Sequence, residues 1–276
     1  MLINNMAEGS AKKTDLASSG LNRAFRNPIA SFLAGFRFLT IIPISWNSSK
    51  DGEFFSSSLI WFPFIGLLIG SVTVSIVSLL MGILPVSLLT VLAMFLLAGF
   101  SGFLHLDGLA DSGDGLLSSR PRKRALEIMR DSHTGAMGVI VLVFVILGKY
   151  AALSSLSGTF FITALFFIPL AGRTAIVLSM AILPYARSGD GLGRLFYSTD
   201  SRKVAVLGLL FCMIIAALLS LKYLLFVIPA ILLTVAIFSL WCFKKLGGAT
   251  GDTLGAVCEL TEFAVAVGVV LVSRIQ

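Results

Sequence analysis

The sequence predicts an all-α integral membrane protein, a polytopic bundle of about seven transmembrane helices with an N-terminal interfacial or re-entrant segment. Of its 276 residues, 57% are hydrophobic and only 13% are charged, whereas soluble domains carry about 25% charged residues. A stretch of 53 residues, 54–106, contains no Asp, Glu, Lys or Arg. Because about 20 mostly apolar residues suffice to cross a bilayer, this stretch alone holds more than one span. These observations exclude a soluble globular protein.

Seven apolar segments are the candidate spans: 58–81, 86–106, 138–156, 160–183, 204–221, 223–243 and 261–275. Gly82 and Pro85 separate the first two segments, and the seventh is short and opens with Glu262. An eighth apolar segment, 29–46, carries Arg37 and is expected to lie at the interface or to re-enter the membrane.

The first 28 residues are polar and lack the apolar core of a secretory signal peptide. We expect 1–28 to be a disordered cytoplasmic lead and 29–276 to form one membrane-embedded catalytic domain. The three cysteines have neither CxxC spacing nor an even count, so we expect no disulfide or zinc site.

Basic residues alternate between the two ends of the predicted spans. They gather before the first span and in the loops 107–137, 184–203 and 244–260, whereas the intervening turns hold only Lys222. The positive-inside rule then places the N-terminus and these three loops in the cytoplasm. Since topology accounts for most of the net charge of +7, we do not expect nucleic-acid binding.

The first acidic motif, "HLDGLADSGDG" (105–115), follows the uncharged stretch directly. Asp107, Asp111 and Asp114 are spaced i, i+4 and i+7, so on a helix they share one face. Three such carboxylates repel one another at a membrane boundary, and a divalent cation such as Mg²⁺ removes the conflict. The alternative is an acidic helix end that faces water. His105 is a general base, a ligand or an interfacial side chain.

A second motif, "GGATGDTLGAVCELTE" (247–262), lies on the same predicted membrane face. Asp252 and Glu259 are seven residues apart, on one face of a helix, and are candidate metal ligands. Thr250 and Gly251 are candidates for phosphate contacts, because small residues let a phosphate approach the backbone. For Asp252 alone, a plain helix cap is the alternative.

Four further residues are candidates for binding phosphate or substrate. Arg130 and Asp131 follow a basic segment close to the third span, and Arg187 lies in the glycine-rich loop 185–193, which is expected to close over a substrate. Arg173 lies inside an apolar segment, where an arginine is expensive and is a functional candidate. Its guanidinium either binds a phosphate, pairs with a carboxylate, or extends along the helix so that the charge reaches the membrane interface.

The motifs together resemble a known family, the cobalamin synthases or adenosylcobinamide-GDP ribazoletransferases. The resemblance is carried by "FRFLTIIPI", "FPFIGLLIG", "HLDGLADSGDG", "EIMRDSHTGAMG", "GRTA", "YARSGDGLG" and "GGATGDTLGAVCEL", in the family's order. Two positions depart from the family pattern, since Ile41 and His133 stand where a basic residue is usual.

The resemblance implies a membrane enzyme that joins α-ribazole, or its 5′-phosphate, to adenosylcobinamide-GDP and releases GMP with Mg²⁺ as cofactor. In the combined hypothesis, Asp107, Asp111, Asp114 and Asp252 hold Mg²⁺, and Asp114 or His105 takes the hydroxyl proton. Arg130 and Arg173 would neutralise phosphates.

Two other functions are weighed against this one. A CDP-alcohol phosphotransferase-like membrane enzyme also places spaced aspartates at a cytoplasmic helix end, but its second acidic half-motif is absent. A transporter would carry ionisable groups near the bilayer midplane. A homo-oligomer and an association with other cobalamin-assembly enzymes are both compatible with the sequence, which does not choose between them.

Overall fold

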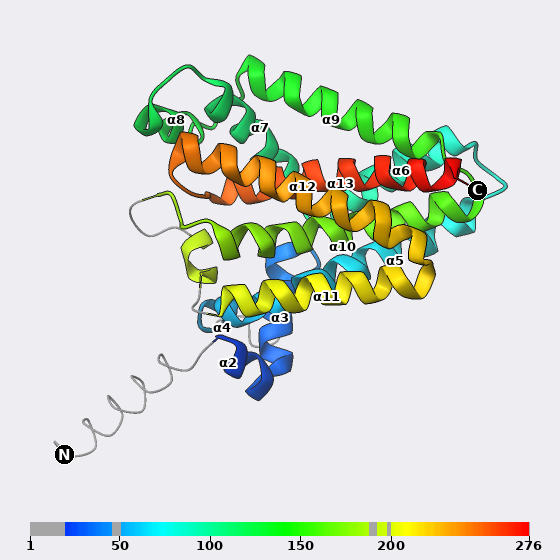
Figure 1. Ribbon diagram of the computed structural model, residues 1–276, viewed down its shortest axis with the longest axis horizontal. Coiled ribbons are helices and arrows are strands. Elements are labelled where there is room, and N and C mark those ends of the chain that lie inside the picture. Colours follow the sequence, from blue (N-terminus) through cyan, green and yellow to red (C-terminus); the bar gives the residue numbers. More distant parts are fainter. Residues whose placement is uncertain (1–19, 46–50, 188–191, 198–199, 276) are drawn as a thin grey trace.

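The computed structural model describes residues 20–45, 51–187, 192–197 and 200–275. These residues form helices and no β-strand, and the long helices run side by side along the longest axis of the molecule (Figure 1). In chain order the elements are α2 (Gly20–Arg26), α3 (Pro28–Leu39), α4 (Asp51–Ser58), η2 (Leu59–Trp61), α5 (Phe62–Leu80), α6 (Val86–Phe100), α7 (Leu104–Leu117), α8 (Arg122–Ile128), α9 (Ala136–Ser154), α10 (Gly158–Ile182), η3 (Leu192–Phe196), α11 (Ser201–Leu219), α12 (Leu221–Leu246) and α13 (Gly251–Arg274).

The predicted all-α membrane bundle is confirmed. Six helices are long and apolar enough to cross a bilayer. They are the continuous segment Asp51–Leu80 and the helices α9, α10, α11, α12 and α13. A seventh span exists if α6 and α7 are counted together, although they are bent by 87°. The prediction that 29–46 does not cross the membrane agrees with α3, whose 12 residues are too short for a bilayer.

The second predicted span, 86–106, is wrong in shape, because the chain breaks after Phe100 and turns into α7. Gly102 and Phe103 adopt left-handed backbone angles, with φ of 57° and 60°. For Phe103 this conformation is uncommon. The backbone N–H of Ile41, just beyond α3, donates to the carbonyl of Phe100 at 2.8 Å and covers the break. The first acidic motif therefore lies on a separate helix.

The seventh predicted span, 261–275, is also corrected, because α13 begins ten residues earlier, at Gly251. Gly247, with φ of 73°, ends α12, and Thr250 starts α13 with a reciprocal capping box to Thr253. The segment 244–260 is thus mostly helix rather than loop. Asp252 lies in the first turn of α13, and Glu259 lies two turns further along.

The N-terminal segment is partly helical. Residues 20–26, which fall within the expected disordered lead, form α2, and the backbone N–H of Leu21 donates to the carboxylate of Asp200 at 3.0 Å. The rest of that lead up to residue 19 lies outside the described residues.

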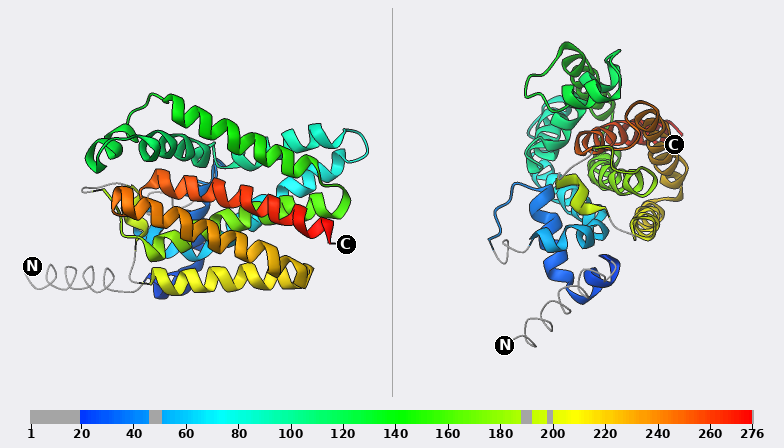
Figure 2. Two further views of the ribbon diagram at one scale, coloured as in Figure 1. Left: turned by 45° about the horizontal axis from the view of Figure 1, so that its top comes forward. Right: turned by 90° about the vertical axis from the view of Figure 1, so that its left-hand side faces the viewer.

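Helix α10 lies at the centre of the bundle, packed on α5, α11, α12 and α13 (Figure 2). Of its most apolar 18-residue window, 83% is buried. Its contact with α5 is very close, because a Cβ added to Gly66 would lie 2.3 Å from the carbonyl oxygen of Pro169. Only glycine allows the two helices this approach.

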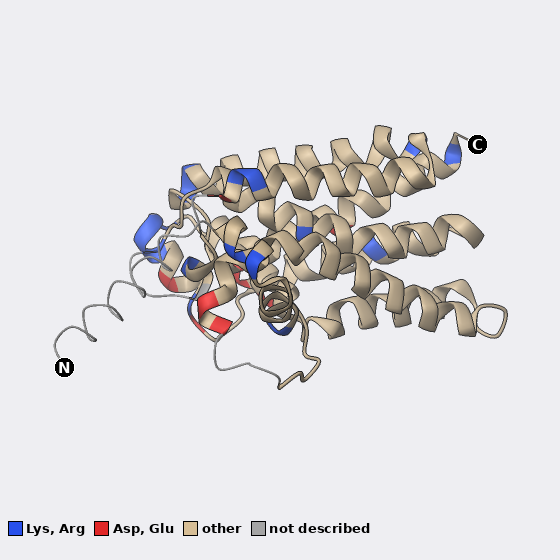
Figure 3. Cartoon of the chain, turned by 90° about the horizontal axis from the view of Figure 1, so that it is seen from below, with Lys and Arg blue, Asp and Glu red and all other residues tan. Residues whose placement is uncertain are grey.

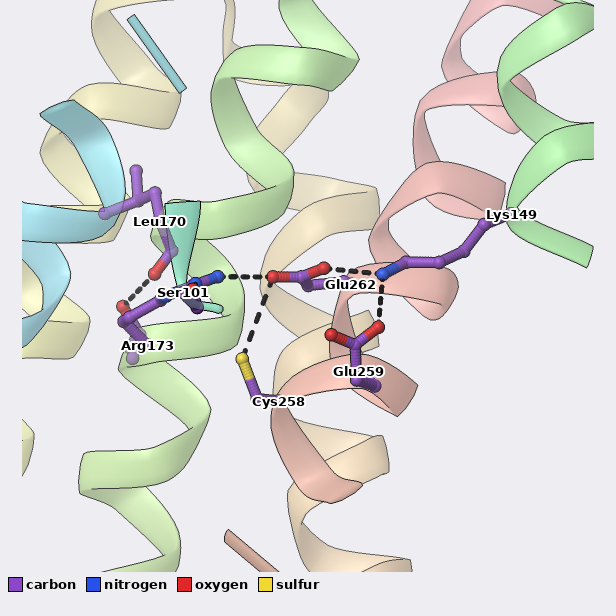
Figure 4. A network of polar contacts seen from close by, with 8 residues as sticks. Ser101, Lys149, Leu170, Arg173, Cys258, Glu259 and Glu262 are labelled. Atoms are coloured by element: carbon purple, nitrogen blue, oxygen red, sulfur yellow. Dashed lines mark hydrogen bonds and ion pairs between the residues drawn. The ribbon is translucent and has the colours of Figure 1, made fainter. Parts of the chain in front are cut away.

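Four buried charged side chains join the helices inside the bundle (Figure 4). Nζ of Lys149, on α9, lies 2.6 Å from a carboxylate oxygen of Glu259 and 2.6 Å from one of Glu262, both on α13. Nη1 of Arg173, on α10, lies 2.5 Å from the other oxygen of Glu262. We call Lys149, Arg173, Glu259 and Glu262 the buried network. Its two cations balance its two carboxylates.

The network also reaches the break between α6 and α7. Nη2 of Arg173 donates to the hydroxyl of Ser101 at 2.6 Å, and Ser101 is the residue that ends α6. A charge is expensive at membrane depth unless it is paired. The network therefore fixes α9, α10, α13 and the break relative to one another.

Replacing Lys149 with Met should strongly destabilise the protein, because Glu259 and Glu262 would share only one buried cation. Breaking a buried ion pair costs about 3–5 kcal/mol. The double variant Lys149→Met, Glu259→Gln should regain most of this loss, because it restores the charge balance. Thermal unfolding in detergent measures both, with exposed Lys244→Met as the control. Equal unfolding temperatures for Lys149→Met and Lys244→Met would contradict the structural role of the network.

Candidate active site

The two acidic motifs meet where α7 crosses α13. A Cβ added to Gly108 would lie 2.8 Å from the carbonyl oxygen of Asp252, and one added to Gly255 would lie 3.2 Å from the backbone of His105. Because glycines stand at both positions, the two backbones can touch. The order of the contacts, with Gly108 beside Asp252 and His105 beside Gly255, shows that the two helices run in opposite directions. This crossing brings Asp252 to the helix that carries Asp107 and Asp111.

Four carboxylates interact at this crossing, and we call Asp107, Asp111, Asp114 and Asp252 the acidic site. The carboxylates of Asp107, Asp252 and Asp114 all repel that of Asp111, while Arg187 attracts it. Asp107 is exposed and the other three are half-buried, so the site opens to solvent on one side. The structure thus brings together the four aspartates that the sequence selected.

Two of these carboxylates already have protein partners. Asp114 accepts hydrogen bonds from the backbone N–H groups of Gly135 and Gly138, at 2.7 and 2.8 Å, and so caps the start of α9. Asp252 accepts from Arg187 at 2.6 Å and from the hydroxyl of Thr250 at 3.3 Å. The carboxylates of Asp107 and Asp111 make no hydrogen bond or ion pair to the described residues.

The acidic site fits a hard divalent cation by its chemistry. Its donors are carboxylate oxygens, the ligands that Mg²⁺ prefers, and Mg²⁺ usually takes only one or two of them together with waters and phosphate oxygens. In the described part of the chain, no three acidic, imidazole or thiol groups already lie close enough to hold one ion. Asp107 and Asp111 are the candidates to hold it, because their oxygens are not used elsewhere.

Glu259 lies apart from the acidic site. Its carboxylate is buried and bonds to Lys149, so the structure assigns it to the buried network and does not support its prediction as a metal ligand. Arg173 likewise bonds to Glu262 and Ser101. Of the alternatives considered for Arg173, the structure therefore shows the pair with a carboxylate and not a side chain free to bind phosphate. Both residues are committed to contacts that neutralise their charge.

Arg130 and Asp131 lie on the exposed turn between α8 and α9. Asp131 bonds to the imidazole of His133 at 2.6 Å, and this hydrogen bond lowers the pKa of Asp131 below its ordinary value. No hydrogen bond or ion pair among the described residues joins the side chains of Arg130 and Asp131 to the acidic site, although Arg187, which binds Asp252, also donates to the carbonyl of the neighbouring Met129 at 3.5 Å.

The second motif contributes the start of helix α13, and the glycine-rich loop 185–193 contributes Arg187. Arg187 bonds to Asp252 of the acidic site, and within the described part of the chain its buried Nε has no hydrogen-bond partner. Thr250 is the buried cap residue of α13, and Gly251 is exposed with open space beside its Cα. The remainder of the predicted closing loop, 188–191, lies outside the described residues.

His105 and an aromatic pocket border the acidic site. His105 is only 5% exposed, and its Nε2 has no hydrogen-bond partner among the described residues. The pocket of about 190 Å³ is lined by His105, Asp107 and Asp252, and further by Phe38, Phe62, Leu104, Gly108, Ile176, Met180, Gly193, Phe196, Gly251, Leu254 and Gly255.

Sequence reasoning missed the aromatic wall of this pocket and also missed Lys149. A lone lysine inside the apolar segment 138–156 was a usable signal, because such a charge must be paired. The aromatic wall gave no comparable signal, since phenylalanines occur throughout the chain.

Comparison with known proteins gives a consistent result. The family model described as cobalamin-5-phosphate synthase matches residues 31–270. Proteins named adenosylcobinamide-GDP ribazoletransferase from Clostridium acetobutylicum and Acetivibrio thermocellus are each 36% identical to this chain, over 82% of its length and 90% and 91% of theirs. The protein of that name from Desulforamulus reducens is 36% identical over 84% of this chain and 93% of its own.

No solved structure matches the chain. The match of the family model covers all the residues of the acidic site and of the buried network. The chain therefore belongs to the cobalamin-5-phosphate synthase family and is a membrane-embedded enzyme of cobalamin synthesis.

Proposed function

We propose that this protein joins α-ribazole, or its 5′-phosphate, to adenosylcobinamide-GDP and releases GMP. The observation that supports this proposal is the acidic site, in which two distant motifs place four interacting carboxylates together, and two of these, Asp107 and Asp252, line a pocket. The printed names of the relatives supply the identity of the substrates. The proposed step forms one phosphorus–oxygen bond and breaks one.

In this step a ribose hydroxyl of the acceptor attacks the phosphorus on the cobinamide side, and the oxygen of GMP departs with its electron pair. A Mg²⁺ ion held by Asp107 and Asp111 would neutralise the pyrophosphate when bound. Asp252 fixes Arg187 beside the site, where the guanidinium offers charge and hydrogen bonds to phosphate oxygens. Positioning and charge neutralisation supply most of the catalysis in such transfers.

The hydroxyl proton goes to His105 in this proposal. Of the two candidate bases, Asp114 has both carboxylate oxygens bonded to the backbone N–H groups of Gly135 and Gly138, so both oxygens are already engaged. Nε2 of His105 has no hydrogen-bond partner among the described residues, and His105 lines the pocket together with Asp107. Asp114 then acts as a positioning residue that joins α7 to α9.

We also propose that the end of the bundle that carries the acidic site faces the cytoplasm of a bacterial inner membrane. Most charged residues gather at that end, and few lie at the other (Figure 3). An excess of Lys and Arg marks the cytoplasmic side of a membrane protein.

This orientation predicts the labelling of two engineered cysteines. After replacement of the three native cysteines, Ser119→Cys, in the turn before α8, should react with a membrane-impermeant maleimide only in opened cells. Ser157→Cys, in the exposed turn before α10 at the other end, should react in intact cells. The reverse pattern would contradict the orientation.

Replacing Asp111 with Asn should abolish the transfer. The change removes an unpaired carboxylate and with it charge stabilisation of several kcal/mol, so the rate should fall by about 100-fold or more. The assay supplies adenosylcobinamide-GDP, α-ribazole and Mg²⁺ to purified protein and measures GMP and the corrinoid product. Glu127→Gln, an exposed carboxylate on α8, is the matched control. Full activity of Asp111→Asn would contradict the assignment of the acidic site, and no turnover by the unchanged protein would contradict the proposed reaction.

Removal of Mg²⁺ should stop turnover and should also lower the unfolding temperature. A bound cation relieves the repulsion among the four carboxylates and stabilises the folded state by mass action. Chelation followed by Mg²⁺ titration measures both effects. In Asp107→Asn, with one carboxylate fewer, the thermal shift with Mg²⁺ should shrink. An equal shift in Asp107→Asn and the unchanged protein would place the ion elsewhere.

A further inference from the structure

The pocket beside the acidic site leads from solvent into the bundle. Asp107, at one edge, is exposed, whereas Phe62 and Phe196 are 1% and 2% exposed. The ring of Phe196 lies 4.4 Å from that of Phe38 and 5.7 Å from that of Phe62, measured between centroids. Three aromatic rings from three separate elements thus form one wall.

The lining of the pocket favours a flat aromatic ligand. Aromatic side chains pack on other rings in offset or edge-to-face geometry and gain more than buried area alone provides. The remaining deep residues are aliphatic, with Ile176 and Met180 contributed by α10. An extended lipid chain has no comparable need for three rings.

His105 supplies a second, independent sign of a ligand. His105 is only 5% exposed and lines this pocket, and its Nε2 finds no partner among the described residues. A buried polar atom without a hydrogen bond costs free energy. A ligand that fills the pocket and carries a hydroxyl at its edge would satisfy this atom.

The volume limits the size of the ligand. The pocket has a volume of about 190 Å³. This space holds one bicyclic ring and excludes a corrinoid macrocycle. A guanine base would bury several donors and acceptors on its edge, and the deep wall offers only His105 as a partner.

We propose that this pocket binds the aromatic base of α-ribazole and thereby directs its ribose to Asp107, Asp252 and His105. The base of α-ribazole is a methylated benzimidazole, which is flat, bicyclic and mostly apolar. This inference rests on the proposed function and adds the location of the acceptor and a limit on its size.

Two neighbouring residues on α10 provide a matched test. Ile176 lines the pocket, whereas Val177 is 1% exposed and does not line it. Ile176→Ala should raise the KM for α-ribazole about tenfold, because contacts with the base are lost. It should also accept an analogue whose base carries an additional fused ring, which the unchanged protein rejects. Val177→Ala should do neither, and the KM for adenosylcobinamide-GDP should stay within about twofold in both variants.

Equilibrium binding of α-ribazole to the purified protein in lipid nanodiscs, measured by calorimetry, separates this inference from the proposed function. Binding that weakens in Ile176→Ala but not in Val177→Ala supports the pocket even if no turnover occurs. Equal α-ribazole affinities and base preferences in the two variants would overturn the inference, as would a raised KM for adenosylcobinamide-GDP in Ile176→Ala. If Ile176→Ala does not fold, the milder Ile176→Val is tested with the same series of bases.

Discussion

The pairing of charges inside the membrane is the constraint on which the rest of this structure depends. Glu262 binds Lys149 with one oxygen and Arg173 with the other, so a single carboxylate joins α9, α10 and α13. In a medium of low dielectric these contacts cannot be exchanged for water, and each partner holds the others in place. Arg173 extends the same constraint to Ser101, at the end of α6. The helices that carry the acidic site therefore have fixed positions relative to one another.

The break after α6 turns this fixed bundle into a site. A straight span would have carried the first acidic motif past α13, but the left-handed angles at Gly102 and Phe103 redirect the chain into α7. Irregular backbone is tolerated at membrane depth only where its polar groups are satisfied. Here the turn bonds to itself, and Ile41 caps the carbonyl of Phe100. Helix α7 can then cross α13 at Gly108, at the distance that only glycine permits.

The sequence predicted what depends on composition and on local spacing. Long apolar segments predicted the class and seven spans, against six in the structure or seven if α6 and α7 are counted together, and the spacing of Asp107, Asp111 and Asp114 predicted the shared helical face. Two other features depend on tertiary contacts and could not be read locally. Glu259 has the spacing of a ligand beside Asp252, yet two helical turns carry it about 10 Å along the axis and into the bundle, where Lys149 binds it. The aromatic pocket needs α3, α5 and η3 to converge, and no single segment contains it.

The position of the site at the edge of the bundle gives a physical reason for placing this chemistry in a membrane protein. The acidic site needs water and ions on one side, and the aromatic pocket needs a dry, rigid wall on the other. Helix α7 begins inside the bundle and ends near the charged loops. Within two turns it carries the buried His105 and the partly exposed Asp111. The buried network keeps that boundary in place, because its charges would be costly to separate. An apolar base and a charged pyrophosphate can then be held at a separation no greater than the length of one short helix.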